Sequence, residues 1–176
     1  MGVADQIVAS RFSSIDLSNK ALNSARHVFI NHAIDICHES VKVHHIRPET
    51  LHVSGISEQA AFTQLLDVIA GKILVAHGCI MEQRFLEQYI KMKYQNLKLP
   101  LIWLDTLKIE QYRTQLRPTR SDWRLSSIRK ELNLPTYQAH NALNDAIATA
   151  ELYLAQINCL FGLSSAPLHV LVNASR

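Results

Sequence analysis

Three acidic residues and one histidine stand where separate elements of the chain are expected to begin or end. Asp16 closes the first expected strand, and Glu82 opens a helix that follows a later strand. Asp145 lies in the first turn of the last expected helix, and His140 stands in the loop just before it. In open α/β sheets, sites form at the strand ends near a switch in strand order. These four side chains, from distant segments, could therefore converge on one point.

Converging carboxylates repel one another unless a cation neutralises them. Mg²⁺ or Mn²⁺ suits carboxylate oxygens and keeps positions open for water and a substrate phosphate. Two such ions about 4 Å apart can activate a water and stabilise the leaving oxygen of a phosphodiester, with a nearby histidine as general base. Each residue taken alone also has a purely structural interpretation. Asp145, for example, is typical of an acidic residue that interacts with the dipole at the start of a helix. The spacing of these residues does not by itself decide between a shared metal site and separate structural roles.

The N-terminal part of the chain has the residue pattern of β-strands. Strands are expected at residues 12–17, 27–36 and 41–46, with a turn at residues 22–25. Successive strands joined by short turns favour an antiparallel meander.

After the meander, the apolar spacing changes to the helical period. Phe62, Leu65 and Ile69 share one face of a helix. Ser57 is its expected N-cap, and Gly71 stands where a C-terminal glycine would end it. Short apolar strands are then expected at residues 72–76 and 101–104, and helices at residues 82–92, 106–116, 126–134 and 142–161. Strands separated by helices imply crossovers, so the order predicts a mixed α/β sheet with helices on its faces.

The composition indicates one globular domain. The chain has 176 residues, 48% of them hydrophobic and 19% charged, and a domain usually takes about 100–200 residues. No apolar run approaches the roughly 20 residues that span a bilayer, and no secretory leader is visible. Cys37, Cys79 and Cys159 fit no zinc-binding spacing, so we expect reduced thiols in a cytoplasmic protein. The net charge of +3 is weak evidence for a polyanionic partner.

Two segments outside this pattern of strands and helices each have more than one possible role. Residues 112–124 carry four arginines with Tyr112 and Trp123 among them, a mixture typical of surfaces that grip single-stranded nucleic acid. A solvated helix-and-loop face explains the same residues equally well. The apolar run at residues 168–172 either pairs as an edge strand or joins a subunit interface.

Two other segments resemble motifs of a known family. Residues 139–150, Ala-His-Asn-Ala-Leu-Asn-Asp-Ala-Ile-Ala-Thr-Ala, resemble the third motif of the DEDDh, or DnaQ-like, 3′–5′ exonucleases. Residues 75–86 resemble the second motif, which usually reads Ala-His-Asn-x-x-Phe-Asp. The resemblance extends over about residues 10–161. The group includes the proofreading epsilon subunit of bacterial DNA polymerase III.

The first motif of that family, Asp-x-Glu-Thr-x-Gly, is only partly kept. Asp16 matches its first residue, but Ser18 stands in place of the glutamate. In the second motif, Glu82 holds the position of the Asp, and Gly78 that of the Asn. Ser18 is neutral and a poor Mg²⁺ ligand, so one of the four acidic ligands is lost. We expect activity that is reduced, dependent on high metal concentration, or absent.

The resemblance implies both a fold and a site. The implied fold is α/β: a ribonuclease-H-like mixed five-stranded sheet, an antiparallel meander then parallel strands, with helices on both faces. It forms a single domain over residues 1–176, with a core at about 10–161 and a C-terminal tail at 162–176. The implied metal ligands are Asp16, Glu82 and Asp145, with His140 as general base. The implied substrate contacts are Leu17, Ser18, His77 and Arg124.

The implied function is the 3′–5′ hydrolysis of phosphodiesters at single-stranded DNA or RNA 3′ ends. The family's two-ion site implies Mg²⁺ or Mn²⁺ as the cofactor, although the loss of the glutamate weakens its occupancy. The alternative is a catalytically inactive module of the same fold that binds nucleic acid or a protein. A polymerase or another protein is a candidate partner, a homodimer stays open, and no membrane contact is expected.

Overall fold

The computed structural model describes residues 9–16, 21–31, 41–42, 46–95, 99–115, 122–138, 142–162 and 164–176. For residues 9–16, 21–27 and Ala142 it describes the backbone alone. The chain forms two compact units. Unit 1 comprises Met1–Ala70 and Tyr137–Ile147, and unit 2 comprises Gly71–Thr136 and Ala148–Arg176.

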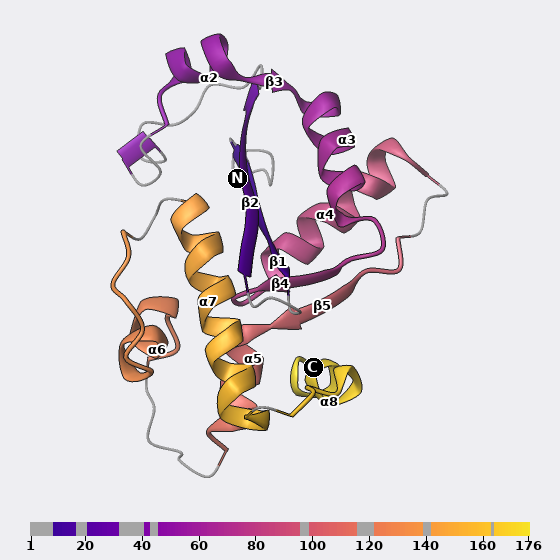
Figure 1. The fold of residues 1–176 in the computed structure, drawn as a ribbon. Helices are drawn as coiled ribbons and strands as arrows, with labels where there is room; N and C mark the ends of the chain where they lie inside the picture. The colour runs from indigo at the N-terminus through magenta and orange to yellow at the C-terminus, as the bar shows by residue number, and fades with distance from the viewer. Residues whose placement is uncertain are drawn as a thin grey trace. The chain divides into compact units, whose positions relative to one another are not determined.

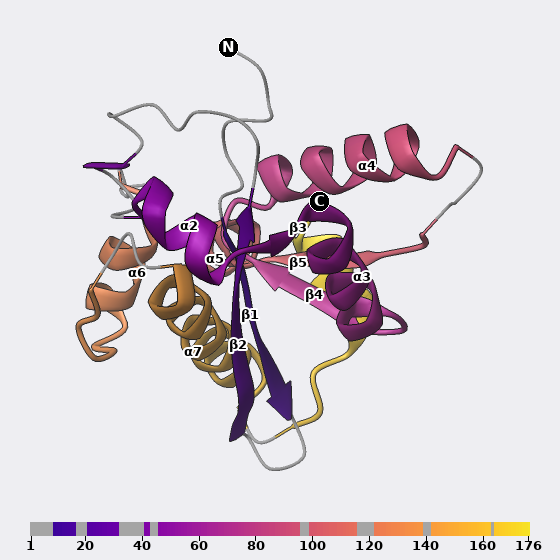
Figure 2. The ribbon, with the colours of Figure 1, turned by 90° about the horizontal axis from the view of Figure 1, so that it is seen from above.

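Unit 1 is built on two long antiparallel strands (Figure 2). Strand β1 spans Ala9–Asp16 and β2 spans Ala21–Asn31. The register places Asp16 opposite Ala21, and it shifts once between Ser13 and Ser14. Strand β3, Ile56–Ser57, pairs with the end of β2 in the parallel direction, which completes a three-stranded sheet in the order β1-β2-β3.

Two helices of unit 1 lie against β2. Helix α2 spans Pro48–Ser54 and α3 spans Glu58–Ile69. Ser57 caps α3 as expected, because its Oγ accepts a hydrogen bond from the Ala60 amide at 3.2 Å. Gly55 lies between these helices, where a Cβ would come within 2.3 Å of the Leu51 carbonyl oxygen. The same Cβ would lie 2.9 Å from the backbone nitrogen of Asn31 on β2, so only glycine fits between the end of α2 and β2.

Unit 2 contains a second, parallel sheet (Figure 1). Strand β4 spans Ile73–Ala76 and β5 spans Ile102–Asp105, and α4, Ile80–Lys93, connects them. Helices α5, Thr106–Arg113, and α6, Leu125–Glu131, follow β5. Helix α8, Leu168–Ala174, contacts β5 and α5. The longest helix, α7, spans Ala142–Phe161 and has its first six residues in unit 1 and the rest in unit 2.

The core of unit 2 combines apolar side chains with paired polar ones. Leu104, Ile109, Ile128 and Leu152 are at most 1% exposed. Glu110 is also fully buried and forms a bidentate hydrogen-bonded pair with Arg113 at 2.7 and 3.0 Å. The side-chain amide of Gln156 on α7 donates to Glu110 and to the Thr106 carbonyl. These partners compensate for the removal of a carboxylate from water.

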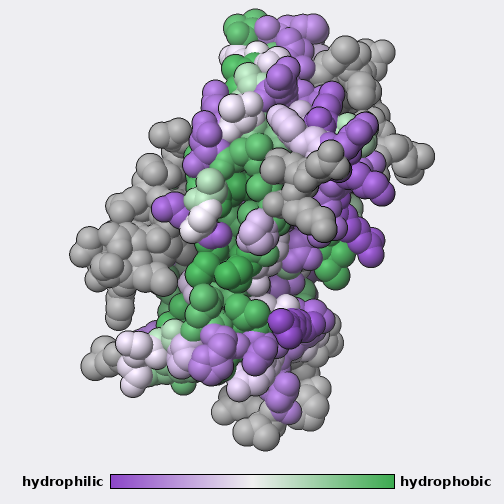
Figure 3. Space-filling model, turned by 90° about the vertical axis from the view of Figure 1, so that its right-hand side faces the viewer, coloured by the Kyte–Doolittle hydropathy of each residue, from purple (hydrophilic) through white to green (hydrophobic). Residues whose placement is uncertain are grey.

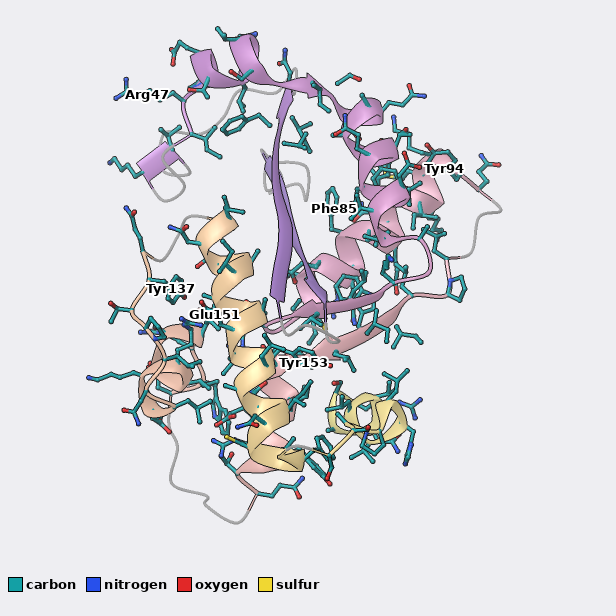
Figure 4. All side chains as sticks on the ribbon, viewed as in Figure 1. Arg47, Phe85, Tyr94, Tyr137, Glu151 and Tyr153 are labelled. Atoms are coloured by element: carbon teal, nitrogen blue, oxygen red, sulfur yellow. The ribbon has the colours of Figure 1, made fainter. Side chains whose placement is uncertain are left out.

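A buried cation joins α6 to α7. Arg129 is 2% exposed, and its guanidinium donates to the Ala148 and Pro135 carbonyl oxygens and to the Glu151 carboxylate. Figure 4 shows Glu151 on α7 beside α6. The planar fork of an arginine serves several acceptors at once, which suits this position.

The large apolar side chains are not all buried. On the face in Figure 3, both apolar and hydrophilic residues reach the surface. In unit 2 the exposed large hydrophobic residues include Ile80, Met81 and Met92 of α4. Among the described residues, no helix is long and apolar enough to cross a membrane.

Several secondary-structure predictions are confirmed. Helix α7 has the predicted bounds, and α3, α4, α5, β4 and β5 fall within a few residues of theirs. Two predictions on the first strands are wrong. Residues 22–25 form no turn, because they continue β2. Val41 and Lys42 of the predicted third strand are helical, and residues 43–45 lie outside the described part.

The third strand of the first sheet is instead β3, and it is parallel rather than antiparallel. The run at residues 168–172 is no edge strand, because it belongs to α8. Within the described residues the strands form a three-stranded and a two-stranded sheet. A single five-stranded sheet and a single domain therefore stay predictions.

Candidate active site

The expected acidic residues of unit 1 lie at the end of a strand and the start of a helix. Asp16 is the last residue of β1, and Asp145 lies in the first turn of α7 with a half-buried side chain. Leu17, Ser18 and His140 lie outside the described residues. The convergence of these groups stays a prediction.

The expected acidic residue of unit 2 is at the start of α4. Glu82 is the third residue of that helix and is exposed to solvent. A carboxylate in the first turn interacts favourably with the helix dipole, whose positive end lies there. The turn His77–Cys79 connects β4 directly to α4, so the geometry of this turn determines where Glu82 lies.

A buried carboxylate holds that turn in place. Asp105, the last residue of β5, is 3% exposed. Its Oδ1 accepts hydrogen bonds from the amides of Gly78 at 2.8 Å and Leu107 at 2.9 Å, and its Oδ2 from the amide of Cys79 at 3.1 Å. One carboxylate thus joins the ends of both strands of the parallel sheet and caps α5.

The thiol beside this carboxylate is kept neutral. Cys79 is buried, and burial raises the pKa of its thiol to about 12, with further contributions from the negative charges of Asp105 and Glu82. Nucleophilic cysteines need the opposite shift, because the thiolate is the reactive form. Cys79 therefore belongs to the structure of the turn, in agreement with the expected reduced thiol.

His77 is held at both ring nitrogens. Its Nε2 lies 2.9 Å from the Trp123 carbonyl oxygen, and its Nδ1 lies 2.9 Å from Thr106 Oγ1. Since a carbonyl can only accept, Nε2 carries a proton and donates to Trp123. The Thr106 hydroxyl also lies 3.2 Å from the Ala76 carbonyl oxygen, to which it can donate. The imidazole thus connects the end of β4 to the start of α5 and to the segment before α6.

Arg124 presents its charge to solvent. It is the N-cap residue of α6, and its side chain is 85% exposed. The Asp122 carboxylate lies 3.9 Å from Arg124 Nε and is itself half exposed, an arrangement that contributes little energy in water.

A hollow of about 630 Å³ opens beside the start of α4, with walls from α4, β5 and α8. Trp103 and the cations of Lys108 and Arg176 are among its lining residues. Glu82 is not among them. We therefore do not assign the predicted acidic site to this hollow.

The comparisons with known proteins agree with the motifs. A family model described as an exonuclease, RNase_T, matches residues 11–153. The chain belongs to this exonuclease family. Among curated proteins, the PolC-type DNA polymerase III of Thermotoga maritima is 29% identical over 128 residues, 73% of this chain and 9% of the polymerase. That of Thermotoga petrophila is 25% identical over 150 residues, 85% of this chain and 10% of the polymerase. The chain spans about a tenth of these relatives.

Solved structures of nucleases share the fold. Exonuclease X, in complex with 5′-overhanging duplex DNA, has a TM-score of 0.70 at 16% identity, covering 99% of this chain and 94% of that one. Cell-death related nuclease 4 (CRN-4) has a TM-score of 0.72 at 14% identity, covering 90% and 60%. The nuclease domain of 3′hExo, a DEDDh family member bound to rAMP, has 0.65 at 12%, covering 91% and 84%. The fold is thus the α/β, ribonuclease-H-like fold of DnaQ-like 3′–5′ exonucleases.

Exonucleases of this family generally use divalent metal ions, and the chemistry of the expected ligands fits them. Asp16, Glu82 and Asp145 offer the hard carboxylate oxygens that such ions prefer. Ser18 reduces the negative charge available in this chain relative to the family pattern. Among the described side chains, no group of three potential ligands lies together, but the side chains of Asp16 and His140 are not in that set.

Two residues that contribute to the geometry of this region were missed by sequence reasoning. Neither Asp105 nor Thr106 is among the site residues that the sequence predicts. The available signal was an aspartate directly before a helical pattern, which is typical of an N-cap. That signal predicts the bond to Leu107, but not the bonds to Gly78 and Cys79, which are distant in sequence.

Proposed function

We propose that the chain is a 3′–5′ exonuclease that removes nucleotides from the 3′ end of single-stranded DNA or RNA. The observation that carries the proposal is the family match over residues 11–153, together with carboxylates at three of the four motif positions. Glu82 supports it, since an exposed carboxylate at the start of α4 is accessible to a ligand. As the chain spans a tenth of its curated relatives, the polymerase activity of those relatives is not transferred to it.

The proposed site residues have separate tasks. Asp16, Glu82 and Asp145 would hold divalent ions, Mg²⁺ or Mn²⁺. Such ions supply a lower pKa for an attacking water and neutralise charge on the scissile phosphate. His140 accepts the proton of the water that attacks phosphorus. The phosphorus–O3′ bond breaks and the leaving O3′ takes a proton from solvent, so the products are a nucleoside 5′-monophosphate and a shortened strand with a 3′ hydroxyl.

The remaining proposed residues bind the substrate. Leu17 and Ser18 follow β1 directly, and Arg124 offers a solvent-exposed guanidinium that suits a phosphate. His77 belongs to this proposed set through its hydrogen bond to the Trp123 carbonyl, directly before Arg124. We also propose a single domain over residues 1–176, a cytoplasmic location and, as candidate partners, a polymerase or another protein, with a homodimer left open.

Ser18 predicts a weak enzyme. The serine lacks the charge of the glutamate, and a misplacement of reacting groups by about 1 Å already costs about 10²-fold in rate. The loss favours the second candidate function, an inactive module of the exonuclease fold that binds nucleic acid or a protein. The two candidates differ in whether phosphodiester bonds are broken.

One assay separates them. Short single-stranded DNA and RNA, labelled at the 5′ end, are incubated with Mn²⁺ and the native chain, Ser18→Glu or Asp145→Ala. We expect cleavage that rises at least about 10²-fold with Ser18→Glu and vanishes with Asp145→Ala. Exposed Asp67→Asn is the matched control for a surface charge change. No cleavage by any variant, with no thermal shift on adding Mn²⁺, would leave the binding module.

A further inference from the structure

The hydrogen bond from His77 to Trp123 joins two segments that lie far apart in the chain. His77 follows β4, and Trp123 comes two residues before the start of α6. The hydrogen bond is partly shielded from solvent, because both His77 and Trp123 are partly buried. On its other side, the imidazole contacts Thr106, which is fully buried. The ring is therefore held from both sides and its position is defined.

The residue after Trp123 is held at its backbone and open at its side chain. The amide of Arg124 donates to Asp122 Oδ1 at 3.0 Å. The carbonyl of Arg124 accepts from the amides of Ser127 and Ile128, both at 3.1 Å. The guanidinium itself is 85% exposed. A rigid backbone with an exposed cation suits a group that must meet a phosphate at a defined place.

We propose that His77 is a positioning residue that fixes the backbone of Arg124 for contact with a substrate phosphate. This inference rests on the proposed function, in which Arg124 binds the nucleic acid backbone. A direct contact of His77 with substrate would compete with the internal bonds that occupy both of its ring nitrogens. The imidazole acts on the substrate through Arg124, because its Nε2–H binds the carbonyl of the residue before it.

Two substitutions separate the bond to Trp123 from the bond to Thr106. The side-chain amide nitrogen of glutamine reaches about as far as histidine Nε2, whereas that of asparagine reaches only as far as Nδ1. His77→Gln therefore keeps a donor for the Trp123 carbonyl. His77→Asn loses that donor, because its side-chain amide reaches only as far as Thr106. The two variants are matched in chemistry and differ in reach.

The first measurement uses the full chain without nucleic acid. Amide hydrogen exchange is followed at Ser127 and Ile128, whose amides bond to the Arg124 carbonyl. We expect exchange at both amides to be about fivefold faster in His77→Asn, and close to wild type in His77→Gln, because the loss of one hydrogen bond is worth about 1 kcal/mol. Amides of residues 152–160 in α7, which belong to the same unit as His77, report whether the variant is folded. Equal exchange in His77→Asn and wild type would overturn the proposal.

The second measurement is the binding of a fluorescent single-stranded oligonucleotide with a free 3′ end. We expect Arg124→Ala to weaken binding about tenfold. The slope of the logarithm of the binding constant against the logarithm of the salt concentration should fall in magnitude by about one. His77→Asn should weaken binding in the native background and have no further effect beside Arg124→Ala, since both act through the same contact. Independent, additive losses would show that His77 contacts substrate directly, against the proposal.

The two measurements fail in different ways. Altered exchange in His77→Asn without oligonucleotide binding by the native chain would refute the nuclease proposal and leave the positioning of Arg124 standing. Unaltered exchange together with native binding would refute the role of His77 and leave the nuclease proposal standing.

Discussion

Substitution of Asp105 by asparagine tests the structural basis of the turn that carries α4. The carboxylate accepts three backbone hydrogen bonds, from Gly78, Cys79 and Leu107, and is 3% exposed. An asparagine has one acceptor oxygen and one donor group. If its oxygen takes the place of Oδ1, the bonds from Gly78 and Leu107 survive. The amide group then faces the Cys79 amide, so two donors oppose each other where water cannot separate them.

The free energy of unfolding should fall by about 2 kcal/mol, because a buried donor without an acceptor costs about 1–3 kcal/mol. For a chain of this size each kcal/mol lowers the melting temperature by roughly 2–4 °C. We therefore expect a fall of about 4–8 °C for Asp105→Asn. Asp105→Ala should be more damaging, since it leaves three backbone donors without the carboxylate.

Tryptophan fluorescence is the assay of choice for this unfolding. The chain has two tryptophans, Trp103 and Trp123, and both belong to unit 2, as does Asp105. Glu87→Gln removes one negative charge from an exposed position on α4, also in unit 2, and is the control. Surface substitutions usually stay within about 0.5 kcal/mol. If the free energy of unfolding of Asp105→Asn lies within about 0.5 kcal/mol of that of the control, the Asp105 carboxylate does not hold the turn in place.

Two further predictions concern buried groups of unit 2. Arg129→Met should lower the free energy of unfolding by about 3 kcal/mol, because the buried Ala148 carbonyl and the partly buried Pro135 carbonyl lose their donor. Urea titration followed by fluorescence measures this change. Iodoacetamide at pH 8 should label exposed Cys159 and spare buried Cys79, by peptide mass. Since folding raises the Cys79 pKa from 9.0 to about 12, its contribution to stability is complete below pH 9 and is lost towards pH 12. Labelling of Cys79 in the native chain at pH 8 would contradict the prediction that its thiol is protected.

The helices were the more predictable part of the fold. Helix α7 begins and ends where its apolar stripe predicted, and Gly162 follows with a φ of +60°. Helix α3 begins after Ser57, whose cap bond is local. Caps and periodicity act within a few residues of sequence, so they can be recognised without knowing the rest of the fold.

The strands and the last helix were less predictable, because their local patterns are ambiguous. Alternation at residues 41–46 extends over too few residues to exclude a helix, and Val41 and Lys42 are helical. Residues 168–172 are rich in β-branched and apolar types, yet they form a helix. Leu168, Leu171 and Val172 also satisfy helical spacing, and burial of Leu171 and Ala174 favours that conformation.

Gly78 shows how the structure changes the meaning of a departure from the family pattern. The motif has an asparagine at this position, so the glycine counts as a loss when side chains alone are compared. Its φ is +71°, in the left-handed region, which glycine and, among other residues, asparagine adopt most readily. This conformation accompanies the hydrogen bonds from the amides of Gly78 and Cys79 to Asp105. Glycine therefore preserves the backbone geometry that places α4 and Glu82, whereas Ser18 has no such equivalence, because no backbone conformation restores a missing carboxylate.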